Sequence, residues 1–391
     1  MGRVFGVLFV LSLVACGKVI GQSEAPGWDP ISPPGPGSFV LADALYQPGA
    51  TALQRSPLTV PTSGAHVASP LSAGTSPVAI PTPDGTGLLL STWKYYGGPP
   101  SAGMEPTTGD RLAHPAIWLL NLETGAQSLV ADGAVSLALS MSGQVAYVRG
   151  DRPDYFANEP FEGTIEVRSL EDLSTIQMLV PEVDNYRVVA WAGNSLLYYK
   201  LRDGGSLDLY RVREGEAPRV LGEQTGVVAV SPDGKNVLVQ HLDSRDADLD
   251  LLDVATGQAL ASVQDLRDSS GAPVGALLLQ GDWRGDTIAA AASAFSGLVF
   301  ILVSPEHGLS VSRTLDLGRS RLPWGLQDPR FSSDGSTVTA VAIIPPKDLA
   351  ASTRPSFTQV VTCRQVASTC SYVTPLPDQS AQAFPVSNPS R

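Results

Sequence analysis

Short apolar runs alternate with polar turns along most of this chain. The clearest stretch begins with apolar Val227–Val230, continues through the polar turn Ser231–Lys235, and resumes with strand-like Asn236–Gln240. Two further β-prone runs, Leu249–Val254 and Gln258–Val263, flank a turn at Ala255-Thr256-Gly257. Runs this short, bounded by Pro, Asp and Gly, predict four antiparallel strands joined by three turns.

The first of these turns recurs six times along the chain. Its glycines are Gly85, Gly143, Gly193, Gly234, Gly285 and Gly335, spaced 58, 50, 41, 51 and 50 residues apart. A period near fifty indicates one supersecondary unit repeated along the chain. The sequence therefore predicts an all-β fold, a six-bladed β-propeller of four-stranded antiparallel blades over residues 77–375. Residues 39–76 form an N-terminal segment that either adds a ring-closing strand to the last blade or forms part of a seventh, so a seven-bladed ring is the alternative.

The turn sequence itself resembles a known repeat. Ser231-Pro232-Asp233-Gly234 before an apolar strand is similar to the WD40-like repeat of TolB-type β-propellers, and the first and sixth turns keep Asp-Gly at Asp84-Gly85 and Asp334-Gly335. The resemblance covers about residues 77–375. TolB carries a separate N-terminal α/β domain for which this chain has no room, so the partners of TolB are not implied.

The N-terminus has the pattern of an export signal. Met1-Gly2-Arg3 is followed by an apolar run, Val4–Ala15, which is too short to span a bilayer as a helix. The run ends in Leu13-Val14-Ala15-Cys16, which resembles the bacterial lipobox. That resemblance implies a lipoprotein signal peptide over residues 1–15 and a lipid, including palmitate, on Cys16. The alternative is an ordinary signal peptide with an incidental Cys16. Lys18, where an Asp would signal inner-membrane retention, favours an outer membrane if the cell has two.

The composition limits the partners of the chain. It holds 26 Lys and Arg against 38 Asp and Glu, a net charge of −12, and an acidic chain without basic runs repels nucleic acid. Residues 16–38, rich in Pro and Gly, predict a tether of roughly 60 Å that holds the domain off the membrane. Residues 376–391 predict a flexible tail. We expect a monomer without cofactor or metal.

Cys363 and Cys370 lie in two β-prone runs around a short polar turn. Six residues separate them, so the two side chains can face each other across a hairpin. An exported chain meets an oxidising compartment, which predicts a disulfide worth roughly 2.5 kcal/mol. The alternative is a pair of free thiols that pack without bonding.

Loop lengths indicate a candidate binding face. Three copies carry long loops between their second and third strands: Trp93–Pro115 in the first, Gly150–Gly163 in the second and Pro345–Phe357 in the sixth. In a six-bladed ring these three blades are neighbours. Their aromatic residues suit recognition of a partner or ligand; they are Trp93, Tyr95, Tyr96, Tyr155, Phe156, Phe161 and Phe357. The alternative is that the loops fold onto their own blades.

Two short motifs that suggest a specific function, calcium binding or cell adhesion, are better explained by the structure of the repeat. Asp243, Asp246, Asp248, Asp250 and Asp253 form an acidic run that lacks the Gly and the distal Glu of a calcium loop, so alternation on the solvent face of a strand explains it better. Arg284-Gly285-Asp286 matches an adhesion tripeptide, but it lies where the repeat requires a turn.

Signals for catalysis are weak. The four His lie in separate segments, and neither a G-x-S-x-G elbow nor a P-loop occurs, so no catalytic residue is assigned. The sequence therefore favours a non-catalytic, membrane-anchored propeller that binds a protein or small ligand of the cell envelope. The alternatives are a propeller hydrolase or lyase with a metal in the central channel, and a purely structural envelope component.

The disulfide has a direct chemical test. When the unreduced protein is denatured and treated with iodoacetamide, we expect neither Cys363 nor Cys370 to be alkylated, because both sulfurs are in the bond. Peptide mass spectrometry before and after reduction measures this. Alkylation of both cysteines without reduction would show two free thiols.

Overall fold

The structure of the chain is a computed structural model. It describes residues 28–34, 38–41, 44–48, 53–58, 65–67, 79–95, 112–151, 155–156, 162–184, 186–202, 206–244, 247–267, 271, 273, 280–291, 297–304, 308–316, 325–332, 335–344, 357–364, 369–372 and 383–385. The elements formed by these residues are all β-strands.

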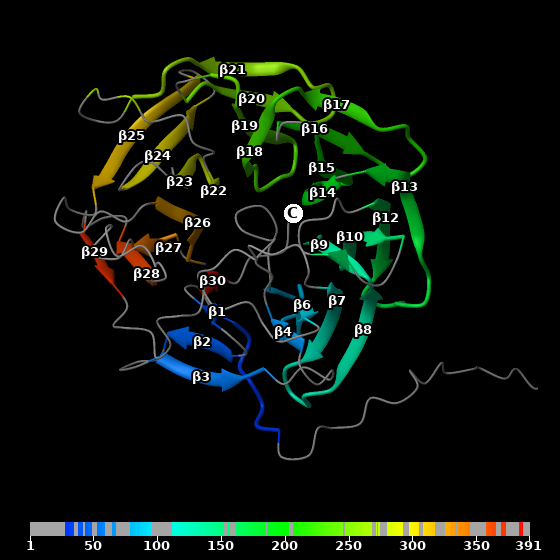
Figure 1. The fold of residues 1–391 in the computed structure, drawn as a ribbon. Helices are drawn as coiled ribbons and strands as arrows, with labels where there is room; N and C mark the ends of the chain where they lie inside the picture. Colours follow the sequence, from blue (N-terminus) through cyan, green and yellow to red (C-terminus); the bar gives the residue numbers. More distant parts are fainter. Residues whose placement is uncertain are drawn as a thin grey trace, which may run out of the picture.

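The strands form seven antiparallel sheets around one axis, as Figure 1 shows. Six of them follow one plan, with the first strand innermost and the fourth at the rim. Blade 1 consists of β5 (Ala79–Pro81), β6 (Gly87–Tyr95), β7 (Leu112–Asn121) and β8 (Gln127–Asp132). Blade 2 consists of β9 (Ala134–Leu139), β10 (Gln144–Gly150), β12 (Glu162–Ser169) and β13 (Gln177–Asp184).

The next four blades repeat the plan with consecutive strands. Blade 3 consists of β14 (Tyr186–Ala192), β15 (Ser195–Leu201), β16 (Leu207–Val212) and β17 (Arg219–Gly222). Blade 4 consists of β18 (Thr225–Val230), β19 (Asn236–His241), β20 (Leu249–Asp253) and β21 (Ala259–Val263). Blade 5 consists of β22 (Gln280–Arg284), β23 (Thr287–Ala291), β24 (Gly297–Ser304) and β25 (Gly308–Asp316), and blade 6 of β26 (Gly325–Phe331), β27 (Thr337–Ile344), β28 (Phe357–Arg364) and β29 (Thr369–Tyr372).

The seventh sheet, here called the closing blade, joins the two ends of the chain. Its strands are β1 (Phe39–Leu41), β2 (Ala44–Pro48), β3 (Leu53–Pro57) and β30 (Ala383–Pro385). The order is β3-β2-β1-β30, and Val40 on β1 pairs with Phe384 on β30. The all-β propeller is thus confirmed, but the ring has seven blades, as in the stated alternative, and not six.

The closing blade also changes the expected boundaries. The strand-like segment 39–76 supplies three strands of the seventh blade, as in the stated alternative, and its fourth strand, at residues 65–67, pairs with β6 of blade 1. Residues 383–385 lie in the stretch 376–391 that was expected to be a flexible tail, and they form the inner strand of this blade. A propeller must close to remove exposed strand edges, and here the closing strand comes from the C-terminal end.

The recurrent turn owes its sequence to a set of hydrogen bonds. In blade 4, the Ser231 hydroxyl donates to Asp233 Oδ1 at 2.7 Å and accepts from the Asn236 amide at 2.9 Å. Gly234 takes φ +67° and donates its amide to the Ser231 carbonyl. The Ser231 hydrogen bond is the main cause of the lowered pKa of Asp233. The same hydroxyl-to-backbone bond occurs at Thr82, Ser140 and Ser332.

Alternating residues along each strand face the two neighbouring blades. On β10, Val145 and Tyr147 pack against blade 1, while Ala146 and Val148 pack against blade 3. Similar clusters of fully buried aliphatic side chains fill the spaces between the other blades, and β30 contacts β27 between the closing blade and blade 6. Burial on both faces of every blade explains why the repeats are apolar runs rather than strict alternations.

The two faces of the ring can be assigned from backbone hydrogen bonds. In blade 4, the Val254 amide donates to the Lys235 carbonyl at 2.8 Å, which joins the first and third turns of the blade. We call this side the turn face. On the other side the Leu242 amide donates to the Gln224 carbonyl at 2.7 Å, which joins the loop after the second strand to the link between blades. We call this side the loop face.

An extended segment, Trp28–Pro34, lies on the turn face beside β3 (Figure 1). Ile31 donates its amide to the Leu122 carbonyl at 2.8 Å, and its side chain is buried. Gln47 on β2 donates to the carbonyls of Ser32 and Pro33, both at 3.1 Å. These residues belong to the predicted tether 16–38, so the part of it that the structure describes is bound to the propeller. We call Trp28–Pro34 the strap.

Ring closure can be tested by truncation. Deletion of residues 376–391 removes β30, so Phe39 and Val40, which are 1% and 0% exposed, lose their inner partner strand. We expect the free energy of unfolding to fall by about 3 kcal/mol or more. Urea unfolding followed by intrinsic fluorescence measures this. Deletion of residues 386–391 alone retains β30 and is the matched control; equal stability of both truncated chains would contradict the closing role.

Candidate functional site

Blade 1 is the blade that departs most from the common plan. Its central strands β6 and β7 have 9 and 10 residues, and two short strands extend the sheet at the loop face. β4 (Ala65–Val67) pairs with β6, and β11 (Tyr155–Phe156) pairs with β7. The sheet order at this end is β11-β7-β6-β4, which we call the loop-face sheet. The two additional strands come from residues 65–67 and from the loop between the second and third strands of blade 2.

The register of the loop-face sheet brings several predicted aromatic residues together. Tyr95 on β6 pairs with Ala113 on β7, and Ala113 pairs with Tyr155 on β11. Tyr95 and Tyr155, sixty positions apart in the chain, thus occupy one row of the sheet. Trp93 lies two rows away, between His66 on β4 and Pro115 on β7. Phe156 follows Tyr155 and pairs with Leu112.

The connection between blades 1 and 2 explains this gathering. β11 belongs to the chain between β10 and β12 of blade 2, yet it pairs with β7 of blade 1. The second-to-third-strand loop of blade 2 therefore crosses to the neighbouring blade. The prediction that these two loops lie next to each other is correct.

The predicted contribution of blade 6 to this face is wrong. Phe357 is the first residue of β28 and pairs with Ile344, so it belongs to blade 6. The closing blade lies between blade 6 and blade 1, as Figure 1 shows. The neighbourhood was inferred from six blades, and the seventh blade lies between these two. Tyr96 and Phe161 lie outside the described residues.

Polar groups also lie at the loop-face end of blade 1, on the side of the closing blade. His114 on β7 lies with its Nε2 2.6 Å from Asp132 Oδ1, at the end of β8. Their side chains are 24% and 50% exposed, so this pair is accessible to solvent. Gly150, at the end of β10, donates its amide to the Gly133 carbonyl at 2.8 Å. The ends of β8 and β10 are therefore held together at the loop face.

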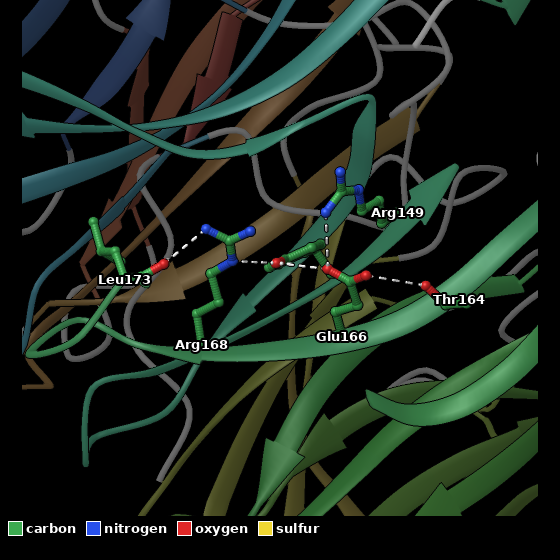
Figure 2. Close-up of polar contacts among 6 residues, drawn as sticks. Arg149, Thr164, Glu166, Arg168 and Leu173 are labelled. Atoms are coloured by element: carbon green, nitrogen blue, oxygen red, sulfur yellow. Dashed lines mark hydrogen bonds and ion pairs between the residues drawn. The ribbon is translucent and has the colours of Figure 1, made fainter. Parts of the chain in front are cut away.

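A polar network lies in blade 2, between β10 and β12 (Figure 2). Arg149 and Glu166 form an ion pair with 3.7 Å between Nη1 and Oε2, and Thr164 donates to Glu166 Oε1 at 3.4 Å. Glu166 Oε2 also accepts a hydrogen bond from the Tyr147 hydroxyl at 3.0 Å. Arg168 donates from Nε to the Tyr147 oxygen at 2.7 Å and from Nη1 to the Leu173 carbonyl at 2.8 Å.

Burial keeps the Tyr147 hydroxyl of this network protonated. The Tyr147 side chain is 0% exposed, and burial, followed by the charge of Glu166, raises the pKa of its hydroxyl far above the usual value. Tyr147 is therefore a neutral donor to Glu166 and an acceptor from Arg168 at any physiological pH. The network fixes Arg149, whose side chain is 40% exposed, at the loop-face edge of blade 2.

The sequence did not indicate this network. Tyr147, Arg149, Glu166 and Arg168 lie on two strands of blade 2 and carry no motif. Their contact follows from the pairing of β10 with β12, in which Tyr147 lies opposite Glu166. The sequence pattern that could have indicated the network is the alternation of polar residues in Thr164–Arg168. Many exposed strands share this pattern, so it is not specific.

The acidic run around Asp248–Asp253 is explained by local hydrogen bonds and ion pairs. Asp250 pairs with His241 at 2.8 Å, and Asp248 accepts the Asp265 amide at 2.8 Å. Asp253 accepts the amide and hydroxyl of Thr256, which lower its pKa. No group of three or more His, Cys, Asp or Glu placed to hold a metal ion occurs among the described residues.

Arg284-Gly285-Asp286 forms the turn between β22 and β23, as expected from the repeat. Gly285 has φ +59°, and Arg284 donates from Nη1 to the Ser332 carbonyl of blade 6 at 2.6 Å. The guanidinium thus joins two blades. At the end of blade 6, Cys363 pairs directly with Cys370 across β28 and β29, the register that the disulfide prediction requires. Cys16 lies outside the described residues, among which no helix is long and apolar enough to cross a bilayer.

Comparison with known proteins identifies the fold. No family model and no curated protein matches the sequence. Among solved structures, TolB from Acinetobacter baumannii is 13% identical with a TM-score of 0.42, over 87% of this chain and 77% of that chain. An oligogalacturonate lyase from Vibrio parahaemolyticus is 13% identical with a TM-score of 0.49, over 87% of this chain and 86% of that chain.

A prolyl endopeptidase structure is 13% identical with a TM-score of 0.52, over 88% of this chain and 47% of that chain. This chain thus spans about half the length of that protein. At such identities a structural likeness concerns the fold alone. The likeness to the prolyl endopeptidase structure agrees with the β-propeller fold described above.

The role of the polar network can be tested with Tyr147→Phe. The substitution keeps the buried ring but removes the hydroxyl that joins Glu166 to Arg168, so we expect the free energy of unfolding to fall by roughly 1–2 kcal/mol. Urea denaturation of purified protein measures the change. Tyr210→Phe, in a ring that stacks on Tyr198 outside this network, is the matched control. An equal effect of the two substitutions would show that the network adds nothing to stability.

Proposed function

We propose that this chain is an extracytoplasmic, lipid-anchored β-propeller that binds a protein or ligand of the cell envelope through the loop face of blades 1 and 2. The observation that carries the proposal is the loop-face sheet, in which two blades contribute strands to one surface. The anchor part of the proposal rests on the sequence before Cys16, with the outer membrane as the site if the cell has two membranes.

Several features of the loop-face sheet support a binding role. It adds β4 and β11 to a blade that is complete without them, and it gathers Trp93, Tyr95, Tyr155 and Phe156 within a few rows. Aromatic residues are enriched at the centres of protein interfaces, where they contribute most of the binding energy. A rigid sheet presents such residues with less loss of conformational entropy than a free loop does.

Charged groups at the border suit the rim of an interface. Arg149 lies on the side of blade 2 that faces blade 1, and the His114–Asp132 pair lies at the loop-face end of blade 1, on the side of the closing blade. All three side chains are partly exposed. Arg149 is held by Glu166, which is itself hydrogen-bonded to Tyr147 and Thr164. Rim charges of this kind contribute more to orientation and association rate than to affinity. An anionic group on the partner would find the Arg149 guanidinium already in place.

The proposal can be tested by crosslinking and pull-down from intact cells. We expect simultaneous replacement of Tyr95, Tyr96, Tyr155 and Phe156 by Ala to reduce partner capture by about tenfold or more, because single interface aromatics often contribute about 2 kcal/mol. Quantitative mass spectrometry of the captured proteins measures the loss. Met178→Ala with Leu260→Ala, at exposed positions on the outer strands of blades 2 and 4, is the control. Undiminished capture by the four-residue variant would remove this binding face.

A further inference from the structure

We propose that the strap Trp28–Pro34 determines how the propeller faces the membrane, with the turn face toward the bilayer and the loop-face sheet away from it. The inference rests on the proposed lipidation of Cys16, because the strap is the first described segment after that residue. In this orientation the surface nearest the lipid headgroups is the turn face. The candidate binding face then remains open to partners in the surrounding compartment.

One end of the strap is bound to the outer turn of blade 1. The Trp28 ring lies over Gly125, where an added Cβ would come within 2.3 Å of the ring. Its Nε1 donates to the Leu122 carbonyl at 3.2 Å, and the Ile31 amide donates to the same carbonyl at 2.8 Å. Ile31 is 7% exposed and packs in the cluster between the closing blade and blade 1. A glycine at position 125 is what permits this close approach.

The other end of the strap is bound to two blades at once. Pro33 lies over Gly85 in the first turn of blade 1, 3.6 Å from a Cβ built there. Gln47 of the closing blade donates to the carbonyls of Ser32 and Pro33. Proline has a fixed φ and lacks an amide hydrogen. This proline-rich segment therefore stays extended and offers mainly carbonyls for hydrogen bonds. The strap therefore joins blade 1 to the closing blade across the turn face.

Binding of the strap shortens the connection to the lipid. Residues 17–27 lie between Cys16 and Trp28, so the longest distance that the chain can cover between those two residues is about 40 Å. The predicted tether of residues 16–38 would have reached roughly 60 Å. The strands of a blade separate the two faces by about 20–30 Å. The longest reach exceeds this separation, but the root-mean-square length of a flexible chain of twelve steps is only roughly 20 Å. A connection of that mean length, leaving from the turn face, favours orientations in which the turn face lies nearer the bilayer than the loop face.

Charge does not explain this orientation. Exposed carboxylates occupy turns on the turn face, including those of Asp84, Glu123, Asp172 and Asp233. Such a face is repelled by anionic lipids over a distance of about 10 Å at ordinary ionic strength. The orientation thus depends on where the strap is bound and on the lipid, and the protein without its lipid should have no affinity for the bilayer.

The experiment separates orientation from lipidation. Purified protein is coupled through the Cys16 thiol to phosphatidylcholine vesicles that contain a maleimide lipid, so it is attached whether or not cells modify Cys16. A donor fluorophore is placed by click chemistry at position 214, on the turn face of blade 3, or at position 243, on the loop face of blade 4. Energy transfer to an acceptor lipid is measured, and Cys16→Ala gives the background coupling.

We expect transfer from position 214 to exceed transfer from position 243 by about two-fold or more, given the separation of the faces. Combined Trp28→Ala and Ile31→Ala should abolish this difference while the protein stays attached and folded by circular dichroism. Leu260→Ala, at an exposed position away from the strap, should keep it. Equal transfer from the two positions with an intact strap would overturn the inference.

Failure of lipidation gives a different result. In cells that produce Cys16→Ala, we expect the protein to move from the membrane fraction to the soluble fraction. Retention of this variant in membranes would refute the lipid anchor, whatever the vesicle measurement shows. A two-fold difference in the vesicles would still support the strap as the device that orients the ring.

Discussion

The pairing of β1 with β30 is the interaction on which the rest of the ring depends. Three residues from each end of the chain, Phe39–Leu41 and Ala383–Pro385, form the junction, and it supplies the innermost strand of the closing blade. Without that strand, blade 6 would lose the contacts of β27 and β28 with β30, and β1 would be an open edge. Among the described strands, this is the pairing that joins the two most distant parts of the sequence. The position of blade 1, and hence of the loop-face sheet, follows from it.

Much of the fold could be predicted because the repeat chemistry is local. The turn is held by hydrogen bonds among Ser231, Asp233 and Gly234 and with the Asn236 amide, all within six residues. The same residues in another copy therefore indicate the same turn. Apolar runs on either side of that turn are buried against two neighbouring blades. The motifs at Asp248–Asp253 and at Arg284–Asp286 were explained correctly for the same reason, since the repeat already placed a strand and a turn there.

The errors arose where a pairing is not local. β30 has three residues, without the turn or the period of the other copies, and its strand character depends on β1, more than three hundred positions earlier. The strap is rich in proline, which is typical of a tether, and its contacts with Leu122 and Gln47 cannot be inferred from its own sequence. β11 belongs to one blade in sequence and to another in space. In each case the composition of a segment indicates the conformation it would take alone, whereas its structure here depends on a partner strand or turn that is distant in sequence.

The strap and the loop-face sheet act on the same blade from opposite sides. Trp28, Ile31 and Pro33 cover the turns of blade 1 on the turn face, and β4 and β11 extend its central strands on the loop face. β6 and β7 run through both regions, so the strap and the row that holds Tyr95 and Tyr155 lie at opposite ends of the same two strands. Blade 1 therefore joins the segment that leads to Cys16 to the candidate binding surface through two hydrogen-bonded strands. The proposed orientation and the proposed binding face thus depend on one blade, because a change in the packing of β6 or β7 would affect both.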